Sequence, residues 1–155
     1  MKVLITKNKQ YVKIDKYDTW SMDVTLAHII VPMLKQLREV THSAPKVSMR
    51  DRPDHLIGTE PRPEIWNTDE YHFEAWDWAL SEMIFAFESK QNDWEEQFLS
   101  GEAEYIDTTL EDGTITWTKS PNHTFKVDNE GRDAYQKRMS NGFRLFGKYY
   151  ENLWD

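Results

Sequence analysis

The most regular chemical pattern in the chain is a polar stripe near its C-terminus. Lys137, Asn141, Arg144 and Lys148 recur at intervals of three or four residues, which places them on one face of a helix. An arginine can bind two phosphate oxygens through its planar guanidinium group, and a lysine adds a point charge. The stripe therefore predicts an anion-binding site. The alternative is a solvated face whose cations pair with the acidic segment 93–112.

Four further residues complete the predicted anion site. Arg138 and Tyr149 lie beside the stripe, and we expect Arg50 and Arg52 to close over it from a long loop. A catalytic set does not accompany them in the sequence, since there is no Cys, no G-x-S-x-G and no glycine-rich phosphate loop. The pattern thus favours binding over catalysis, with no cofactor, and the predicted ligand is small, anionic and nucleotide-like.

The stretch "DTWSMD" at residues 18–23 is a second candidate for the ligand site. Ser21 is a favourable N-cap, and Asp23 lies in the first helical turn, where a negative charge is stabilising. Trp20 either packs back onto this turn or offers its ring to a base. In the second interpretation Asp18 or Asp23 accepts hydrogen bonds from the ligand, and Trp20 faces the Lys137–Lys148 stripe across one pocket.

A metal site is a weaker hypothesis. Glu74 and Asp77 are three residues apart, so a helix presents both carboxylates on one face. A Mg²⁺-dependent nucleotide hydrolase needs a second acidic pair, for which Glu82 and Glu88 are the candidates. The alternative is a solvated acidic face.

The predicted elements give an α+β fold that is predominantly α-helical. Short strands are expected at 2–6 and 11–15, and helices from Ser21 to Val40, over 69–89, and from an N-cap at Asp128 onward. Pro32 predicts a kink or a break into two helices. A short acidic helix is expected at 93–99, and a hairpin over 103–118 turns at Asp112–Gly113. We expect a single domain over 1–155, with three main helices and one small antiparallel sheet.

Two other features carry expectations about packing. Gly142 and Gly147 lie inside the last predicted helix, where glycine is unfavourable, so each indicates close approach of another element or a ligand. Four of the six prolines lie in residues 43–68, which predicts a long wrapping loop or lid, with a mobile excursion as the alternative.

The net charge of −8 is local in origin. Segment 93–112 holds eight acidic residues and no basic one, and the rest of the chain is balanced. A balanced body with one acidic region is a poor nucleic-acid binder, because such binding needs clustered Lys and Arg. The acidic segment instead suggests a protein-binding inhibitor that mimics the charge of DNA. The chain has no apolar run long enough to span a membrane, and its seven Trp, seven Tyr and seven Phe favour a homo-oligomer.

Several segments together resemble a family of small tailed-bacteriophage proteins. They are "DTWSMD", "LAHIIVPMLKQL", "WDWALSEMIFAFES", "SPNHTFKVD" and, most specifically, "NGFRLFGKYYENLWD". The likeness runs from about residue 14 to the C-terminus, although this chain has Val24 where family members often carry His, and "THS" at 41–43 in place of "KHG". The resemblance implies phage origin and expression in the host cytoplasm. A non-catalytic protein that sequesters a nucleotide signal of host defence is the leading hypothesis, and an acidic inhibitor of a host nuclease or polymerase is the alternative.

Overall fold

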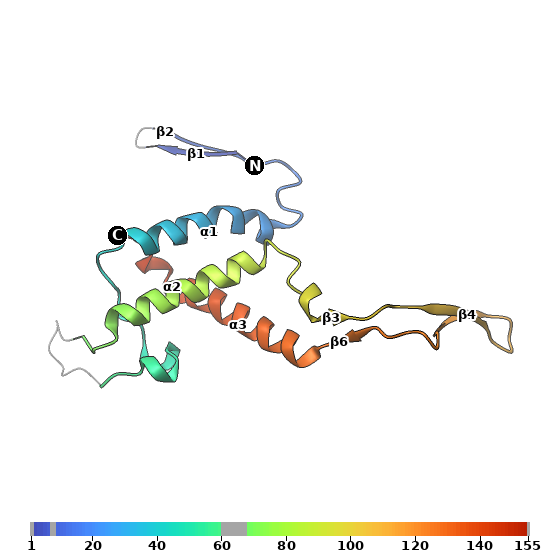
Figure 1. The fold of residues 1–155 in the computed structure, drawn as a ribbon. Helices are drawn as coiled ribbons and strands as arrows, with labels where there is room; N and C mark the ends of the chain where they lie inside the picture. Colours follow the sequence, from blue (N-terminus) through green and yellow to red (C-terminus); the bar gives the residue numbers. More distant parts are fainter. Residues whose placement is uncertain (1, 7–8, 60–67, 155) are drawn as a thin grey trace. The chain divides into compact units, whose positions relative to one another are not determined.

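A computed structural model describes residues 2–6, 9–59 and 68–154 of the chain. Three helices dominate it: α1 (Met22–Val40), α2 (His72–Ser89) and α3 (Asn129–Lys148) (Figure 1). Six short strands form three antiparallel pairs: β1 (Lys2–Thr6) with β2 (Lys9–Lys13), β3 (Leu99–Ser100) with β6 (Lys126–Val127), and β4 (Tyr105–Thr109) with β5 (Ile115–Lys119). The predicted α+β class with three main helices is confirmed. The described strands form three separate two-stranded sheets, however, and not one shared sheet.

The chain divides into two compact units. The first, called the helical unit here, comprises Met1–Asn92 and Arg138–Asp155, and the second, called the hairpin unit, comprises Asp93–Lys137. α1, α2 and the C-terminal part of α3 belong to the helical unit, whereas β3 to β6 belong to the hairpin unit. A single domain over 1–155 stays a prediction.

The core of the helical unit lies between its helices and the segment that follows α1. Leu80 and Met83 of α2, Leu145 of α3 and Val47 of that segment are fully buried. α1 and α2 run side by side in opposite directions, and ion pairs join them at both ends: Asp23 with Lys90, and Arg38 with Asp77. α2 also supplies Trp76 to this core.

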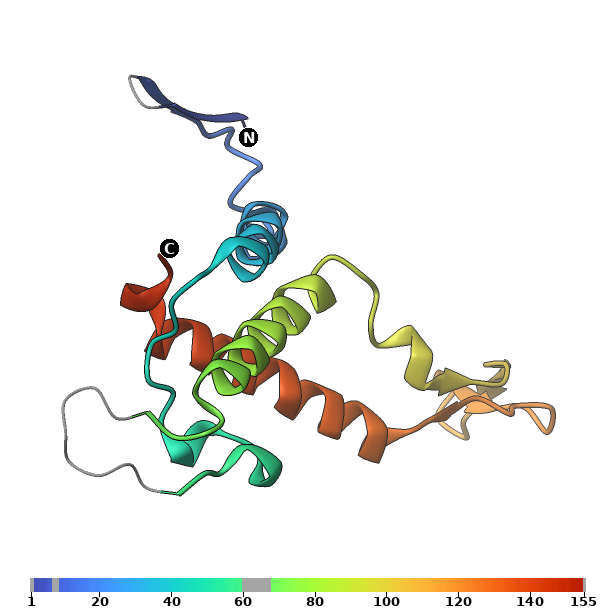
Figure 2. The ribbon, with the colours of Figure 1, turned by 60° about the vertical axis from the view of Figure 1, so that its left-hand side comes forward.

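α3 crosses α2 at Gly142 (Figure 2). A Cβ atom at Gly142 would lie 2.3 Å from the carbonyl oxygen of Glu82 and 2.6 Å from the Cβ of Ala86. The predicted close approach of another element at Gly142 is therefore confirmed. At Gly147 no other element of the described chain approaches closely, because a Cβ atom there would meet no atom within 4 Å.

The start of α1 differs from its prediction. Ser21 occupies the N-cap position, but its side chain makes no capping hydrogen bond, and the Asp23 carboxylate in the first turn binds Lys90 at 2.8 Å. Pro32 lies inside one continuous helix, so a break into two helices is wrong. Proline removes one backbone donor from a helix, and the packing of Ala27, Val31 and Leu34 on the same helix offsets that loss.

The described part of the long loop is packed against the helical unit. Two short 3₁₀ helices, η1 (Met49–Asp51) and η2 (Asp54–Leu56), form there, and Val47 and Leu56 are buried. These residues are the predicted wrapping loop. The expectations for 60–67, which include Pro61 and Pro63, lie outside the described residues.

The hairpin unit has a small aromatic cluster of its own. Trp94 stacks on Tyr135 with ring centroids 5.0 Å apart, and Phe98 meets Tyr135 edge to face. Asp128 caps α3, since its Oδ1 accepts a hydrogen bond from the Gly131 N–H at 2.9 Å, as predicted. The expected helix at 93–99 is reduced to the 3₁₀ turn η3 (Glu96–Phe98). The β4–β5 hairpin is confirmed, and Gly113 takes the positive φ of its turn.

Candidate functional site

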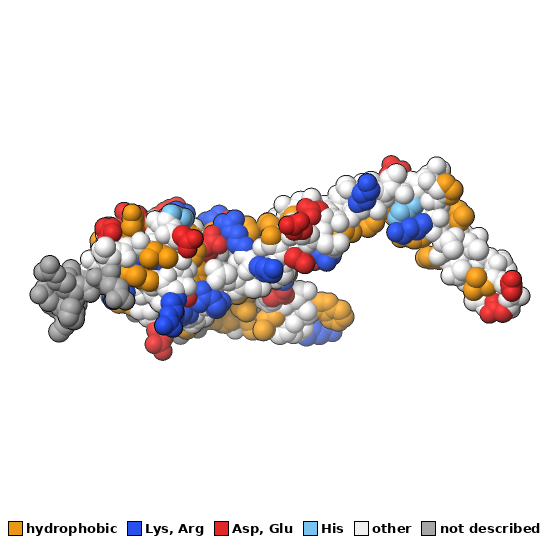
Figure 3. Space-filling model, turned by 90° about the horizontal axis from the view of Figure 1, so that it is seen from below, with side chains coloured by type: hydrophobic (Ala, Val, Ile, Leu, Met, Phe, Trp, Pro, Cys, Tyr) orange, Lys and Arg blue, Asp and Glu red, His pale blue; other side chains and the backbone are white. Residues whose placement is uncertain are grey.

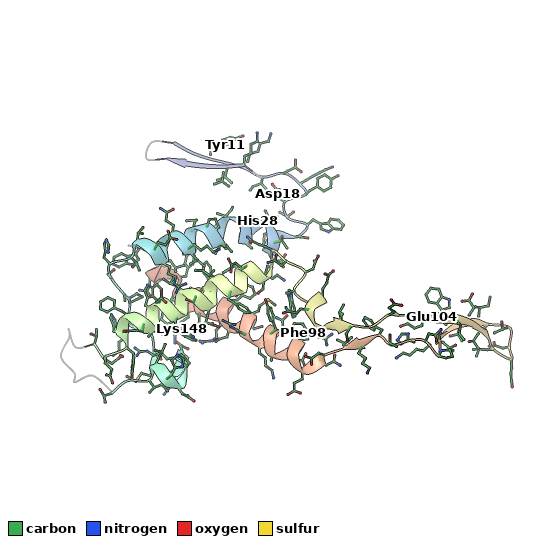
Figure 4. The ribbon with its side chains drawn as sticks, viewed as in Figure 1. Tyr11, Asp18, His28, Phe98, Glu104 and Lys148 are labelled. Atoms are coloured by element: carbon green, nitrogen blue, oxygen red, sulfur yellow. The ribbon has the colours of Figure 1, made fainter. Side chains whose placement is uncertain are left out.

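Two cations of the α3 stripe, Arg144 and Lys148, converge on one carboxylate of the helical unit. Arg144 donates from Nη1 to Oδ1 of Asp51 at 2.7 Å, and Lys148 donates from Nζ to Oδ2 at 2.5 Å. The Tyr149 hydroxyl donates to the same Oδ2 at 2.7 Å, and it accepts a hydrogen bond from the Ser48 N–H. Figure 4 shows Lys148 close to the segment that carries Asp51. We call these residues, with Asn141, the Asp51 ion cluster.

The electrostatics of the cluster hold Asp51 in its ionised form. Its side chain is only 6% exposed, and this burial by itself would raise the pKa. Hydrogen bonds from Lys148, Tyr149 and Arg144 outweigh the burial and lower the pKa of Asp51 to about 2. Burial and the Asp51 carboxylate together raise the pKa of the Tyr149 hydroxyl, so that it stays a donor. The stripe does bind an anion, and that anion belongs to the chain itself.

Sequence reasoning missed both Asp51 and the burial of Tyr149. The stripe was expected either to bind a ligand or to pair with the acidic segment 93–112, but Arg144 and Lys148 pair with Asp51 of the loop instead. Asn141 supports this arrangement, since its Oδ1 accepts two hydrogen bonds from Arg144, at 3.0 and 2.8 Å. The sequence alternates basic and acidic residues around Asp51, which indicates ion pairs in this loop. The alternation does not indicate which residue pairs with Asp51.

Arg52 is a structural residue, which corrects its prediction as a ligand-binding residue. Its guanidinium group binds both carboxylate oxygens of Asp69, at 2.7 and 2.9 Å. The remaining donors reach the carbonyl oxygens of Val47 and Leu56. Both charged side chains are almost fully buried, at 0% and 1% exposed. All five donors of the guanidinium group are therefore used within the chain.

Arg138 also makes internal contacts. It binds the Glu82 carboxylate through Nε and Nη2, with a shortest distance of 2.7 Å, and its guanidinium lies 3.8 Å from the centroid of the Phe85 ring. This cation–π contact and the ion pair tie α3 to α2. Arg50 and Lys137 are exposed. The predicted closure of two arginines over a ligand is thus not formed, because Arg52 points into the fold.

Trp20 and the Lys148 end of the stripe lie near opposite ends of α2, so they do not line one pocket. α1 begins beside the C-terminal end of α2, as the Asp23–Lys90 ion pair shows, whereas Tyr149 packs edge to face on Trp76 near the start of α2. Trp76 and Lys90 are separated by roughly 20 Å of helix. Trp20 is 87% exposed, and Asp18 accepts a hydrogen bond from the Asp15 N–H within the same turn. The prediction that Trp20 and the stripe face each other across one pocket is therefore wrong.

One member of the acidic pair expected at a metal site, Asp77, is also engaged by an internal partner. Asp77 accepts two hydrogen bonds from Arg38, at 2.6 and 2.7 Å, and Glu82 is held by Arg138. Among the described residues, Glu74 is the one member of that predicted set that forms no ion pair. It lies exposed on α2. The described part of the chain contains no group of three His, Asp or Glu side chains that could hold a metal ion.

The hairpin unit presents its charge in a different way. All eight acidic side chains of segment 93–112 are exposed, and in the described part of the chain none of them belongs to an ion pair. Residues 93–137 hold eleven acids and four bases, which gives −7 of the total charge of −8. Glu104 projects from the backbone just before β4 (Figure 4).

Large apolar side chains lie among these acids. Trp117 is 76% exposed and Ile115 is 66% exposed, both on β5, and Tyr105 and Ile106 of β4 are also exposed. The space-filling view shows hydrophobic and acidic side chains together at the surface of this hairpin (Figure 3). Single exposed apolar residues are ordinary, but here Tyr105, Trp117 and Ile115 lie together on one face of the hairpin.

A second apolar feature lies in the helical unit. A groove of about 770 Å³ runs between α1 and the C-terminal end of the chain, lined by Met33, Leu37, Val40, Phe146 and Tyr150 among others. Met33 and Tyr150 are largely exposed there.

Comparisons with known protein families, with curated proteins and with solved structures found no match. Among the described residues, no helix combines the length and the apolar character that a membrane span requires.

Proposed function

We propose that this chain is a non-catalytic binding protein whose hairpin unit docks into a basic groove of a partner protein. The observation that carries the proposal is the set of eight exposed carboxylates in 93–112, none of them in an ion pair among the described residues. A groove that binds the phosphates of a nucleic acid with Lys and Arg also attracts a row of carboxylates. The function is then competition with nucleic acid for that groove.

The exposed rings support the same proposal. Charged rims mainly speed association and set specificity, whereas desolvated aromatic anchors supply much of the affinity. Trp117 and Tyr105 lie on the same hairpin as Asp107, so one surface carries both kinds of group. The likeness to bacteriophage proteins favours a host nuclease or polymerase as the partner, and inhibition as the outcome.

The test is affinity capture from a bacterial lysate with the full chain as bait. We expect wild type to retain a nucleic-acid-binding protein that added duplex DNA releases. The triple variant Glu102→Lys, Glu104→Lys and Asp107→Lys should lose that protein. The matched control is Glu39→Lys, Glu74→Lys and Glu151→Lys, which makes the same charge change on exposed residues of the helical unit and should retain it. If both variants capture the same proteins as wild type, the proposal is wrong.

A second candidate function is capture of a small nucleotide-like anion at the Asp51 ion cluster. It is favoured by Arg144, Lys148 and Tyr149, which already donate hydrogen bonds to a carboxylate. Asn141 supports Arg144 by accepting hydrogen bonds from it. A phosphate group of the ligand would replace the Asp51 carboxylate, because both present oxygens that a guanidinium can bind in pairs. In a phage such a protein would sequester a nucleotide signal of host defence without cleaving it.

Calorimetry with inorganic pyrophosphate and with a panel of nucleotides tests this candidate. Asp51→Asn removes the competing charge, so it should bind pyrophosphate at least about tenfold more tightly than wild type. Arg144→Gln in the same background should remove that gain. An absence of binding in both wild type and Asp51→Asn contradicts the candidate, as does release of a cleaved nucleotide after the protein is denatured.

A further inference from the structure

Two hairpins of the chain carry opposite charges of equal size. Residues 2–16, called the N-terminal hairpin, contain five lysines and one aspartate, a net charge of +4, and include β1 and β2. Residues 102–119, called the acidic hairpin, contain five acids and one lysine, a net charge of −4, and include β4 and β5. Complementary charge steers association and fixes which surfaces meet.

Both hairpins also have unused edges. Among the described strands, β1 pairs only with β2, and β4 pairs only with β5, so each strand has one unpaired edge. A two-stranded hairpin is marginally stable in water by itself, and an open edge is a template for another strand. Exposed apolar side chains lie on each: Tyr11, Val12 and Ile14 on the first, Ile115 and Trp117 on the second. Each hairpin therefore lacks the cover that the other could supply.

We propose that the acidic hairpin of one copy binds the N-terminal hairpin of a second copy, so that the chain self-associates. The contact joins two open strand edges, sets lysines against carboxylates, and covers apolar side chains of both hairpins. It goes beyond the proposed function, since it names what occupies the acidic hairpin when no partner protein is bound. A partner with a basic groove then competes with the second copy for the same surface.

Light scattering of the full chain tests the proposal without any substitution. Self-association should be present at about 0.1 M salt and largely lost at about 1 M, where the Debye length falls to about 3 Å. A chain that is monomeric at both salt concentrations overturns the proposal, and so does an assembly whose size ignores salt.

Charge reversal gives a sharper second test. One variant carries Lys2→Glu, Lys13→Glu and Lys16→Glu, and the other carries Glu102→Lys, Glu104→Lys and Asp107→Lys. Each alone should weaken self-association by roughly tenfold or more, and an equimolar mixture should associate again, because each variant keeps one native hairpin and the reversed surfaces complement one another. The Glu39→Lys, Glu74→Lys and Glu151→Lys variant should self-associate like wild type. Failure of the mixture to associate, with both variants folded by circular dichroism, overturns the proposal.

The same variants separate this inference from the proposed function. The variant reversed at Lys2, Lys13 and Lys16 keeps the acidic hairpin, so it should still capture a partner protein from the lysate. If it captures the partner and wild type is monomeric, only the self-association is wrong. If wild type self-associates with the expected salt dependence and captures nothing that DNA releases, only the proposed function is wrong.

Discussion

Carboxylates of the helical unit such as Asp51, Asp69 and Glu82 are held by arginine or lysine side chains, whereas the eight carboxylates of segment 93–112 face solvent. The helical unit carries a net charge of −1, from sixteen acids and fifteen bases, and the hairpin unit carries −7. In the first, charge fixes the positions of loop and helices. In the second, charge stays at the surface, where it is available to a partner. The charges of the helical unit thus support its internal structure, whereas those of segment 93–112 remain on the surface.

The largest expected effect on stability comes from breaking an internal ion pair of the helical unit. Asp69→Ala leaves the Arg52 guanidinium buried without its carboxylate, which should cost about 3–5 kcal/mol of the free energy of unfolding. The same change at an exposed carboxylate of the hairpin unit, Asp107→Ala, should stay within about 0.5 kcal/mol. Urea unfolding followed by circular dichroism measures both values. Equal losses in the two variants would show that the units do not use their charges differently.

An effect of intermediate size is expected on the pH dependence of stability. Asp51 has its pKa lowered from 3.8 to about 2 in the folded chain, so its contribution to stability is complete above about pH 5. It is lost as the pH falls through 3.8 and toward 2, because the unfolded chain then binds a proton that the folded chain does not. The full contribution is about 2 kcal/mol. We expect acid unfolding of wild type to show this slope.

Asp51→Asn should remove that part of the pH dependence and lower stability at neutral pH. Asp54→Asn is the matched control, since Asp54 is an exposed carboxylate three residues along the same loop. Stability measured from pH 7 to pH 2 compares the three proteins. A wild-type slope that survives in Asp51→Asn would mean that the Asp51 ion cluster does not tie the loop to α3.

The same contrast explains how far the sequence could predict this structure. The Asp128 cap, the Asp112–Gly113 turn and the close approach at Gly142 were predicted correctly, because each leaves a signal within a few residues. The partner of Arg144 and Lys148 was not, since Asp51 lies 93 and 97 residues away along the chain. Charge pairing over such separations depends on how helices cross, and local periodicity does not encode that. The burial of Arg52 was missed although its partner Asp69 is only 17 residues away, because the sequence between the two has no helical or strand periodicity that would predict their contact.

The smallest expected effect compares the two helix starts that the sequence predicted in the same way. Asp128 makes a capping hydrogen bond to the Gly131 N–H, whereas the Ser21 side chain makes none. Asp128→Ala should therefore cost about 1 kcal/mol and speed hydrogen exchange in the first turn of α3, because an orphan N–H loses its acceptor. Ser21→Ala should change the first turn of α1 by only a few tenths of a kcal/mol. Amide exchange read by NMR resolves each turn separately. Similar losses at both sites would show that Ser21 caps α1 in solution after all, and that the ion pair of Asp23 with Lys90 is not enough to hold the start of that helix.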